Sequence, residues 1–231
     1  MPKIIVSIII PVFNEAEQIG RLVEALRDLI PDERPVEILV VDGGSEDRTV
    51  QIASGLQGVI VLRSERGRAI QMNRAAKQAK GDYLYFLHAD TTPPEGFLDS
   101  IIYSGSDAGC FRMRFGDSNS PWLSGATYFT RFQGRFFRGG DQSMFVKKDL
   151  FVRVGGFDSR YEVYEDVEFI LRLKRAARFI ILKDYVETSA RLFRKNGVLR
   201  LYYHFFIIHM MAILKYPPKR LSGYYKGNIV K

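Results

Sequence analysis

Residues 4–15 have the sequence IIVSIIIPVFNE, and this stretch decides the fold class. The nearly unbroken β-branched run Ile4–Ile10 predicts a strand that is covered on both faces, because a strand with one wet face would alternate apolar and polar residues. Pro11 interrupts the run and no small-residue cleavage site follows, so we expect a buried strand here and not a signal peptide. The helical spacing of Glu15–Leu29 then predicts a crossover helix.

The same strand-then-helix unit recurs through the first half of the chain. We expect further strands at Val36–Val41, Val59–Arg63 and Tyr83–Leu87, with helices at Arg48–Ser54 and Arg68–Ala79. Ser45 is the predicted N-cap of the first of these two helices. Such repetition predicts an α/β fold with a mixed, mainly parallel sheet flanked by helices.

The second half is less regular. We expect strands at Ala108–Arg114 and Gln142–Val146, and helices at Trp122–Phe132, Lys148–Val154 and from Glu165 to about Ala176. The predicted organisation is a main domain at 1–195, with halves at about 1–105 and 106–195, and a helical appendage at 196–231.

Composition limits the class of protein. The chain has 231 residues, 46% of them hydrophobic, and its single cysteine, Cys110, excludes an internal disulfide and a thiolate zinc cluster. A reducing, cytoplasmic compartment follows. The formal net charge of +8 suits an anionic partner, but the basic residues are scattered, so we expect no nucleic-acid partner.

An aromatic helix is predicted at Leu199–Leu214 in the appendage. About sixteen residues form a helix of roughly 24 Å, which is short of the roughly twenty residues that span a bilayer. Its aromatic residues and the basic residues that follow it suit either a peripheral membrane contact, at the cytoplasmic face, or a homodimer contact.

Polar side chains follow the predicted strands where ligands bind in open α/β sheets, beyond the carboxyl ends. Asn14, Glu15, Asp42 and Asp90 stand there. Gathered carboxylates repel one another unless a cation or a hydrogen-bonding ligand is present. Oxygen ligands of this kind suit Mg²⁺ or Mn²⁺, whose coordination is completed by substrate phosphates, and a phosphorylated substrate follows.

Several ordered motifs carry a family resemblance. They are Ser7-Ile-Ile-Ile-Pro-Val-Phe-Asn-Glu15, Val41-Asp-Gly-Gly-Ser-Glu-Asp-Arg-Thr49 and Glu165-Asp-Val-Glu168. Together they resemble family 2 glycosyltransferases over about residues 4–175, and Arg66–Asn73, His88–Asp90 and Gly140–Gln142 resemble a small, soluble bacterial subgroup. The resemblance implies a GT-A (Rossmann-like) fold, a nucleotide-diphosphate sugar donor with UDP or GDP favoured, a divalent metal and inversion at the anomeric carbon.

The resemblance also implies roles at the nucleotide. Asp42 would hydrogen-bond the base or ribose, and Pro11, Asn14 and Glu15 would form the wall around the base. An alternative for Asp42 is to cap the turn that it begins.

The family's Asp-x-Asp metal motif is replaced by His88, Ala89 and Asp90. Asp90 is the implied metal ligand. His88 either ligates Mn²⁺, bonds a phosphate or ribose, or has a structural role in which a nearby carbonyl group satisfies it. Ala89 would adjoin the donor. Arg68 would neutralise the diphosphate. Asn73, on the helix that follows, would lie beside the donor or simply hold the loop. Arg191 and Arg194 stand where a second basic clamp is expected.

Asp166 matches the family's catalytic base, which removes the proton of the acceptor hydroxyl on the face of the sugar opposite the leaving diphosphate. Glu165, Gly140 and Asp141 would lie on the acceptor side. The alternative for Glu165 and Asp166 is a purely structural role, in which both stabilise a helix N-terminus through its dipole.

Two other functions remain open from the residues alone: a nucleotide-binding module without transfer activity, and a nucleotidyltransferase. Proteins of either kind usually have a glycine-rich loop directly after the first strand, and this sequence has none there. The acceptor is not specified by any motif, and a lipid-linked acceptor is compatible with the aromatic appendage.

Overall fold

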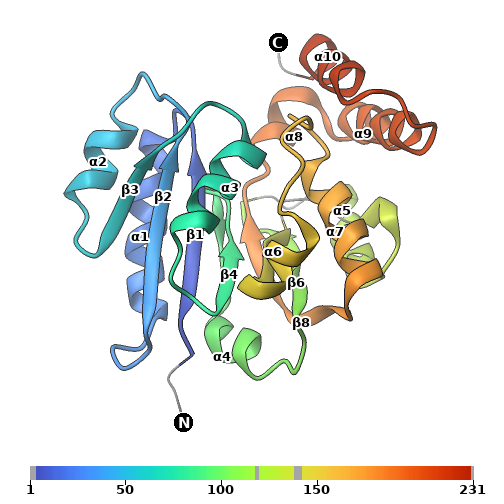
Figure 1. Ribbon diagram of the computed structural model, residues 1–231. Coiled ribbons are helices and arrows are strands. Elements are labelled where there is room, and N and C mark those ends of the chain that lie inside the picture. The colour runs from blue at the N-terminus through green and yellow to red at the C-terminus, as the bar shows by residue number, and fades with distance from the viewer. Residues whose placement is uncertain (1–3, 118–119, 138–141, 230–231) are drawn as a thin grey trace.

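The computed structural model in Figure 1 describes residues 4–117, 120–137 and 142–229. Within these residues the strands form one sheet with the order β3-β2-β1-β4-β7-β6-β8-β5. The strands are β1 Val6–Val12, β2 Val36–Asp42, β3 Val59–Arg63, β4 Tyr83–Phe86, β5 Thr91–Thr92, β6 Ala108–Phe115, β7 Met144–Lys147 and β8 Phe179–Thr188. β1 to β4 are mutually parallel, whereas β7 is antiparallel to both β4 and β6. The expected mixed, mainly parallel sheet is confirmed.

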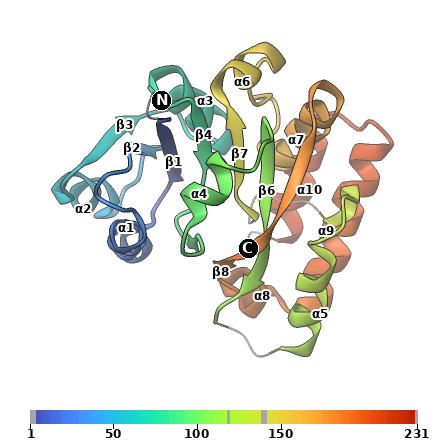
Figure 2. The same ribbon diagram turned by 90° about the horizontal axis from the view of Figure 1, so that it is seen from below.

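Helices cover both faces of the sheet. They are α1 Ala16–Leu29, α2 Thr49–Gly55, α3 Arg68–Gln78, α4 Phe97–Ile102, α5 Pro121–Phe129, α6 Lys148–Val154, α7 Glu165–Ala176, α8 Arg191–Asn196, α9 Val198–Ile213 and α10 Pro218–Asn228, with a short 3₁₀ helix at Arg135–Phe137. Figure 2 shows α1 and α2 on one face and α3 on the other.

The central strand β1 divides its side chains between two apolar clusters. Ile8 and Ile10 pack with α1 and α4, whereas Ile9 packs with α3, α6 and α7. This alternation follows from the period of two in a strand, and it explains why the whole run is apolar. Because β1 pairs in parallel with β2 and with β4, the carboxyl ends of these three strands lie along one edge of the sheet.

A third apolar cluster joins the C-terminal helices to the rest of the chain. It contains Leu201 and Ile208 of α9 and Leu221 of α10, together with Val167 of α7 and Phe193 of α8. Among the described residues, no helix combines the length and the hydropathy that a membrane crossing needs. The division of the chain at about residue 195 stays a prediction.

Several predicted boundaries differ from the structure. β1 continues through Pro11 to Val12, because its partner β2 pairs as far as Asp42. The helix expected at Trp122–Phe132 ends at Phe129, and the strand expected from Gln142 begins at Met144. The Pro217-Pro218 pair does not only close α9, because Pro218 occupies the first position of α10, where its missing N–H costs nothing.

Candidate active site

Asp42 closes β2 and is held by its own loop. The side chain is 4% exposed, and its carboxylate accepts the backbone N–H of Gly44 at 3.0 Å and that of Ser45 at 3.1 Å. Gly44 has a φ of +87°, which a residue with a Cβ rarely adopts. The turn therefore fixes the carboxylate beside Val12, the last residue of β1.

The loop after β1 is fastened to the loop after β2. The backbone N–H of Asn14 donates to Ser45 Oγ at 2.9 Å, and Asn14 Oδ1 accepts the N–H of Glu46 at 2.9 Å. The prediction that Ser45 caps the next helix is wrong. α2 begins at Thr49, whose N–H is bonded by Asp47 at 2.9 Å, since Asp47 is nearer to the first turn and Ser45 is engaged by Asn14.

Gln71 supports both loops from below. Its side chain is 2% exposed, and its Nε2 donates to the carbonyl oxygens of Val12 at 2.8 Å and Val41 at 2.7 Å. A Cβ on Gly43 would lie 3.0 Å from the Gln71 amide, so this position needs a glycine or a shift of the glutamine. The sequence did not single out this role, although one amide stands among the apolar residues that α3 buries.

An arginine from the C-terminal half of the chain forms ion pairs at the same edge of the sheet. Arg191, at the start of α8, lies 3.1 Å from Glu15 Oε1 and 4.0 Å from Asp90 Oδ2. The N–H of Ser189 donates to the carbonyl oxygen of Asp90 at 3.2 Å. Burial raises the pKa of Glu15, although Arg191 opposes this shift. Arg194 instead pairs with Asp117 at 2.6 Å, away from Asp90.

His88 lies among the charged groups of the site. Burial and the charge of Arg68 lower its pKa to about 4, while the charges of Asp90 and Asp166 act in the opposite direction. The imidazole is therefore neutral near pH 7, and a neutral ring nitrogen is the form that binds a metal. Neighbouring Ala89 is 6% exposed.

Asp90 and His88 offer two donor groups for a metal. Among the residues that the structure describes, no group of three or more His, Cys, Asp or Glu side chains is placed to hold a metal ion. This small donor set fits Mg²⁺ or Mn²⁺, which bind through one or two protein groups and complete their coordination with water and phosphate oxygens. It does not fit a cage made by protein alone.

Arg68, the arginine predicted at the diphosphate, and nearby Arg66 have different surroundings. Arg68 begins α3, and its Nε lies 2.8 Å from Oε1 of Glu165, which is 1% exposed. Arg66 lies with its guanidinium 3.8 Å from the centre of the Phe13 ring. The Phe13 contact was not expected from the sequence, because the two residues are 53 positions apart.

Asp166 is the second residue of α7 and is half-buried. Its Oδ1 accepts the N–H of Val167 at 2.7 Å. Tyr164, the residue before the helix, has a φ of +70°, so the chain turns sharply into α7. Three carboxylates lie in the first turn, and the helix dipole stabilises them.

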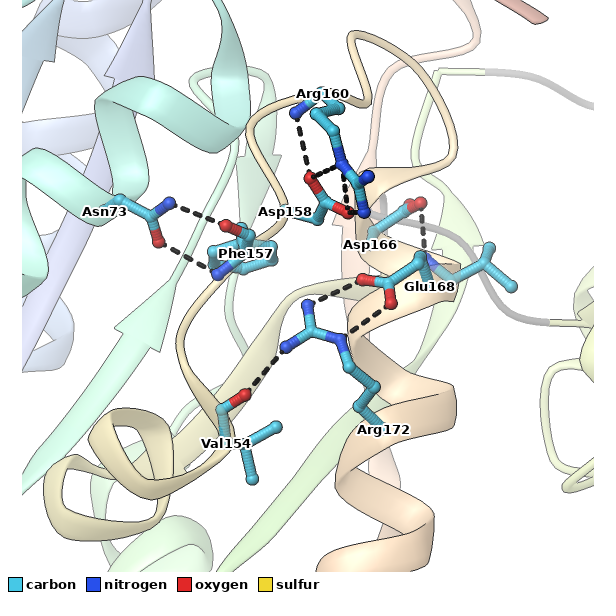
Figure 3. A network of polar contacts seen from close by, with 9 residues as sticks. Asn73, Val154, Phe157, Asp158, Arg160, Asp166, Glu168 and Arg172 are labelled. Atoms are coloured by element: carbon cyan, nitrogen blue, oxygen red, sulfur yellow. Dashed lines mark hydrogen bonds and ion pairs between the residues drawn. The ribbon is translucent and has the colours of Figure 1, made fainter. Parts of the chain in front are cut away.

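The segment that leads to Asp166 is anchored from α3, as Figure 3 shows. Asn73 Nδ2 donates to the carbonyl oxygen of Phe157 at 2.8 Å, and Asn73 Oδ1 accepts the Phe157 N–H at 2.9 Å. Asp158 next to it binds the guanidinium of Arg160. Asn73 thus holds the loop before Asp166, which agrees with the second of its two expected roles.

A second anchor lies on α7 itself (Figure 3). Glu168 binds Arg172 through two bonds of 2.7 and 2.6 Å, and Arg172 also donates to the carbonyl oxygen of Val154 at 3.0 Å. This ties α7 to the end of α6. Gly140 and Asp141, predicted on the acceptor side, lie outside the described residues.

The chain is similar to known glycosyltransferases over most of its length. A model described as glycosyl transferase family 2 matches residues 7–154. The chain is 27% identical over 224 residues to the succinoglycan biosynthesis protein ExoA of Rhizobium meliloti, an alignment that covers 86% of this chain and 66% of that protein. It is 32% identical over 178 residues to an uncharacterized glycosyltransferase of Mycobacterium tuberculosis, covering 72% and 68%. The alignment with the glycosyltransferase AglE of Haloferax volcanii covers 36% of that protein.

Solved structures agree in fold. A mannosyltransferase of Pyrobaculum calidifontis in complex with GDP-Man and Mn²⁺ superposes with a TM-score of 0.67 at 20% identity, covering 97% of this chain and 67% of the other. TarS 1–349 of S. aureus in complex with UDP-GlcNAc superposes with a TM-score of 0.66 at 21% identity, covering 80% and 58%. The predicted GT-A fold is confirmed.

Proposed function

The chain belongs to glycosyl transferase family 2, and from this premise we propose that it transfers a sugar from a nucleotide-diphosphate sugar to an acceptor hydroxyl, with inversion at the anomeric carbon. Asp166 is the general base. The observation that carries the proposal is the arrangement around His88, where the charges of Arg68, Asp90 and Asp166 all act on one side chain. A cation, a basic group and a carboxylate base are the groups that this transfer requires in one place.

The nucleoside lies at the ends of β1 and β2 in this proposal. Asp42 accepts hydrogen bonds from the base or ribose, and Pro11, Asn14 and Glu15 form the adjoining wall. The mutual bonds of Asn14, Ser45 and Glu46 support it, because they hold both loops in place before a ligand arrives. UDP and GDP are the favoured nucleotides, since the two solved relatives hold UDP-GlcNAc and GDP-Man.

The diphosphate lies between Arg68 and the His88–Asp90 pair. Asp90, with His88, would hold Mg²⁺ or Mn²⁺, and the bound cation would neutralise charge on the departing diphosphate. The Mn²⁺ in the mannosyltransferase complex supports this choice of metal class. Arg68 donates to phosphate oxygens through its terminal nitrogens, while its Nε stays bonded to Glu165.

Asp166 performs the proton transfer. The Asn73–Phe157 and Glu168–Arg172 pairs brace the start of α7 and the loop before it. This bracing supports the proposal, because a base must be held in place to act on a bound acceptor. As the acceptor oxygen attacks the anomeric carbon, Asp166 removes the hydroxyl proton, and the bond between the anomeric carbon and the diphosphate breaks. Glu165 does not take this role, because it is buried against Arg68.

The test is turnover with a panel of UDP- and GDP-sugars in the presence of Mn²⁺ or Mg²⁺, measured as release of the nucleoside diphosphate. The wild-type chain should release one nucleotide, and Asp166→Asn should not. Proton NMR of the glycoside product measures its anomeric coupling constant, which should correspond to the configuration opposite to that of the donor. Retention of configuration would refute the direct displacement.

A further inference from the structure

α9 is strongly apolar, with Arg200 as its one charged residue, yet among the described residues only one side of it is packed against the rest of the chain. Leu201 and Ile208 are buried, and Phe205 packs against the third apolar cluster. The opposite side, named here the α9 outer face, consists of Leu199, Tyr203, Phe206, Ile213 and Leu214, with exposed fractions of 66%, 60%, 52%, 38% and 65%. The spacings of four, three and seven residues place the first four on one stripe of the helix.

Other surface helices of the chain behave differently. α1 buries Ile19, Leu22 and Leu26, and its exposed positions carry charges such as Glu17 and Glu24. A stripe of exposed apolar side chains on an otherwise packed helix is normally covered by protein or lipid. The α9 outer face therefore requires an apolar partner.

The net positive charge of the chain is concentrated in the C-terminal segment that contains α9. Residues 188–231 carry nine Lys and Arg residues and no Asp or Glu, whereas residues 1–187 carry 25 basic and 26 acidic residues. The segment therefore accounts for the whole positive balance. Its basic residues include Lys195 and Arg200 near the beginning of α9, and Lys215, Lys219 and Arg220 after its end, all of them exposed.

We propose that the α9 outer face docks on an anionic lipid bilayer, with its aromatic and aliphatic side chains at the level of the headgroups and the flanking basic residues on lipid phosphates. Exposed apolar side chains bordered by Lys and Arg are the features that bind a helix in the plane of an anionic interface. A second copy of the chain fits less well. Arg191, Arg194 and Lys226 are paired with acidic residues outside the segment. A symmetric contact would still bring the exposed Lys195, Arg200, Lys215, Lys219 and Arg220 of two copies together, with no acidic residue in either segment.

The docked face is linked to the candidate active site. The Phe206 ring stacks on Phe136 with centroids 6.1 Å apart, and Phe136 stacks on His209 at 5.4 Å. His209 in turn meets the ring of Tyr164 edge to face at 5.0 Å, two residues before Asp166. In Figure 1 the helices α8, α9 and α10 lie at the same end of the molecule as the carboxyl ends of β1 and β2. Docking would thus present the site to an acceptor carried by the membrane.

Co-sedimentation with vesicles tests the proposal directly and needs no sugar donor. The full chain is mixed with vesicles of phosphatidylcholine alone, or with about 30% phosphatidylglycerol, at low salt and at about 0.5 M salt. The apolar variant is Leu199→Ser/Tyr203→Ser/Leu214→Ser, which spares Phe205 because that ring is packed. Its matched control is Tyr103→Ser/Val152→Ser, at residues that are 72% and 68% exposed elsewhere on the surface. The charge variant is Lys219→Glu/Arg220→Glu, with Arg74→Glu/Lys77→Glu on α3 as control.

Binding of the wild-type chain to the anionic vesicles is expected, and it should weaken at least about tenfold in the apolar variant and in the charge variant. Both control variants should bind as the wild type does. Circular dichroism and the thermal midpoint of every variant show whether its fold is intact. Failure of the wild-type chain to bind anionic vesicles would overturn the proposal. Binding of the folded apolar variant as strong as that of the wild type would also overturn it. So would sedimentation equilibrium in which the wild type and the other variants are dimers and the apolar variant is a monomer.

Discussion

Arg68 Nε lies 2.8 Å from Glu165 Oε1, and this contact joins the first residue of α3 to the first residue of α7. α3 follows β3, the neighbour of the strand β2 that ends in Asp42, and α7 carries Asp166. The ion pair therefore links the proposed donor side to the helix of the proposed base. Because Glu165 is 1% exposed, its carboxylate depends on groups of the protein rather than on water.

The strength of this pair can be measured with a double-mutant cycle. We expect Arg68→Met to destabilise the fold by about 1–3 kcal/mol, since it removes this partner from a buried carboxylate. Glu165→Gln should cost less, because the Arg68 side chain is 39% exposed and keeps contact with water. The double variant should lose less than the sum, with a coupling energy of about 1–2 kcal/mol. Urea unfolding supplies the free energies. Additive losses would show that the two side chains do not support one another.

Replacement of the base separates catalysis from folding. Asp166→Asn should lower kcat at least about a hundredfold while the KM for the donor changes little, because the amide cannot accept the hydroxyl proton. Asp149→Asn, an exposed aspartate in the first turn of α6, is the matched control and should keep full activity. An Asp166→Asn protein with near-normal kcat would remove this residue from the mechanism.

Gln71→Leu tests the support beneath the two loops. The substitution removes the bonds to the carbonyl oxygens of Val12 and Val41. Val12 keeps the N–H of Gly43 as a donor, so a loss of about 1–3 kcal/mol in the free energy of unfolding is expected. Gln78→Leu at the exposed end of α3 should cost less than about 0.5 kcal/mol. Equal effects of the two changes would contradict the proposed support.

The protonation of His88 predicts a pH dependence of stability. Its pKa is about 4 in the folded chain, lowered by burial and by Arg68, whereas an unfolded histidine has a pKa of about 6.5. The unfolded chain therefore takes up a proton first as the pH falls. In metal-free buffer the wild type should lose on the order of 2 kcal/mol between pH 7 and pH 4.5 that His88→Gln does not lose. Parallel pH curves for both proteins would show that the folded histidine titrates normally.

Local signals in the sequence defined some elements well. Lys148–Val154 and Glu165–Ala176 have the predicted bounds, because Gly155 ends one helix with a φ of +88° and carboxylates open the other. β8 was missed. Its parallel pairing with β6 contains an irregularity after Cys110, and exposed Lys183 and Asp184 interrupt its apolar pattern.

Some residues of the candidate site could likewise be predicted from the sequence, and others could not. Asp42, Asp90 and Asp166 could be singled out because each stands in a recognisable motif at the end of a strand or the start of a helix. The Arg191–Glu15 and Arg68–Glu165 pairs could not, since their partners are 176 and 97 positions apart and their meeting depends on the order of strands in the sheet. Asn73 was placed on the right helix, but its partner Phe157 comes from the other half of the chain.

The central claim is that the edge formed by Asp42, His88 and Asp90 binds a nucleoside diphosphate together with a divalent metal. The most direct measurement is the thermal midpoint of the wild-type chain and of Asp90→Ala with UDP, GDP, CDP, ADP or TDP, each with and without Mn²⁺. A ligand that binds only the folded state raises the midpoint. The account predicts a metal-dependent rise for one nucleotide, UDP or GDP, that is absent in Asp90→Ala. A rise that is equal in Asp90→Ala, or no rise with any nucleotide, would contradict it.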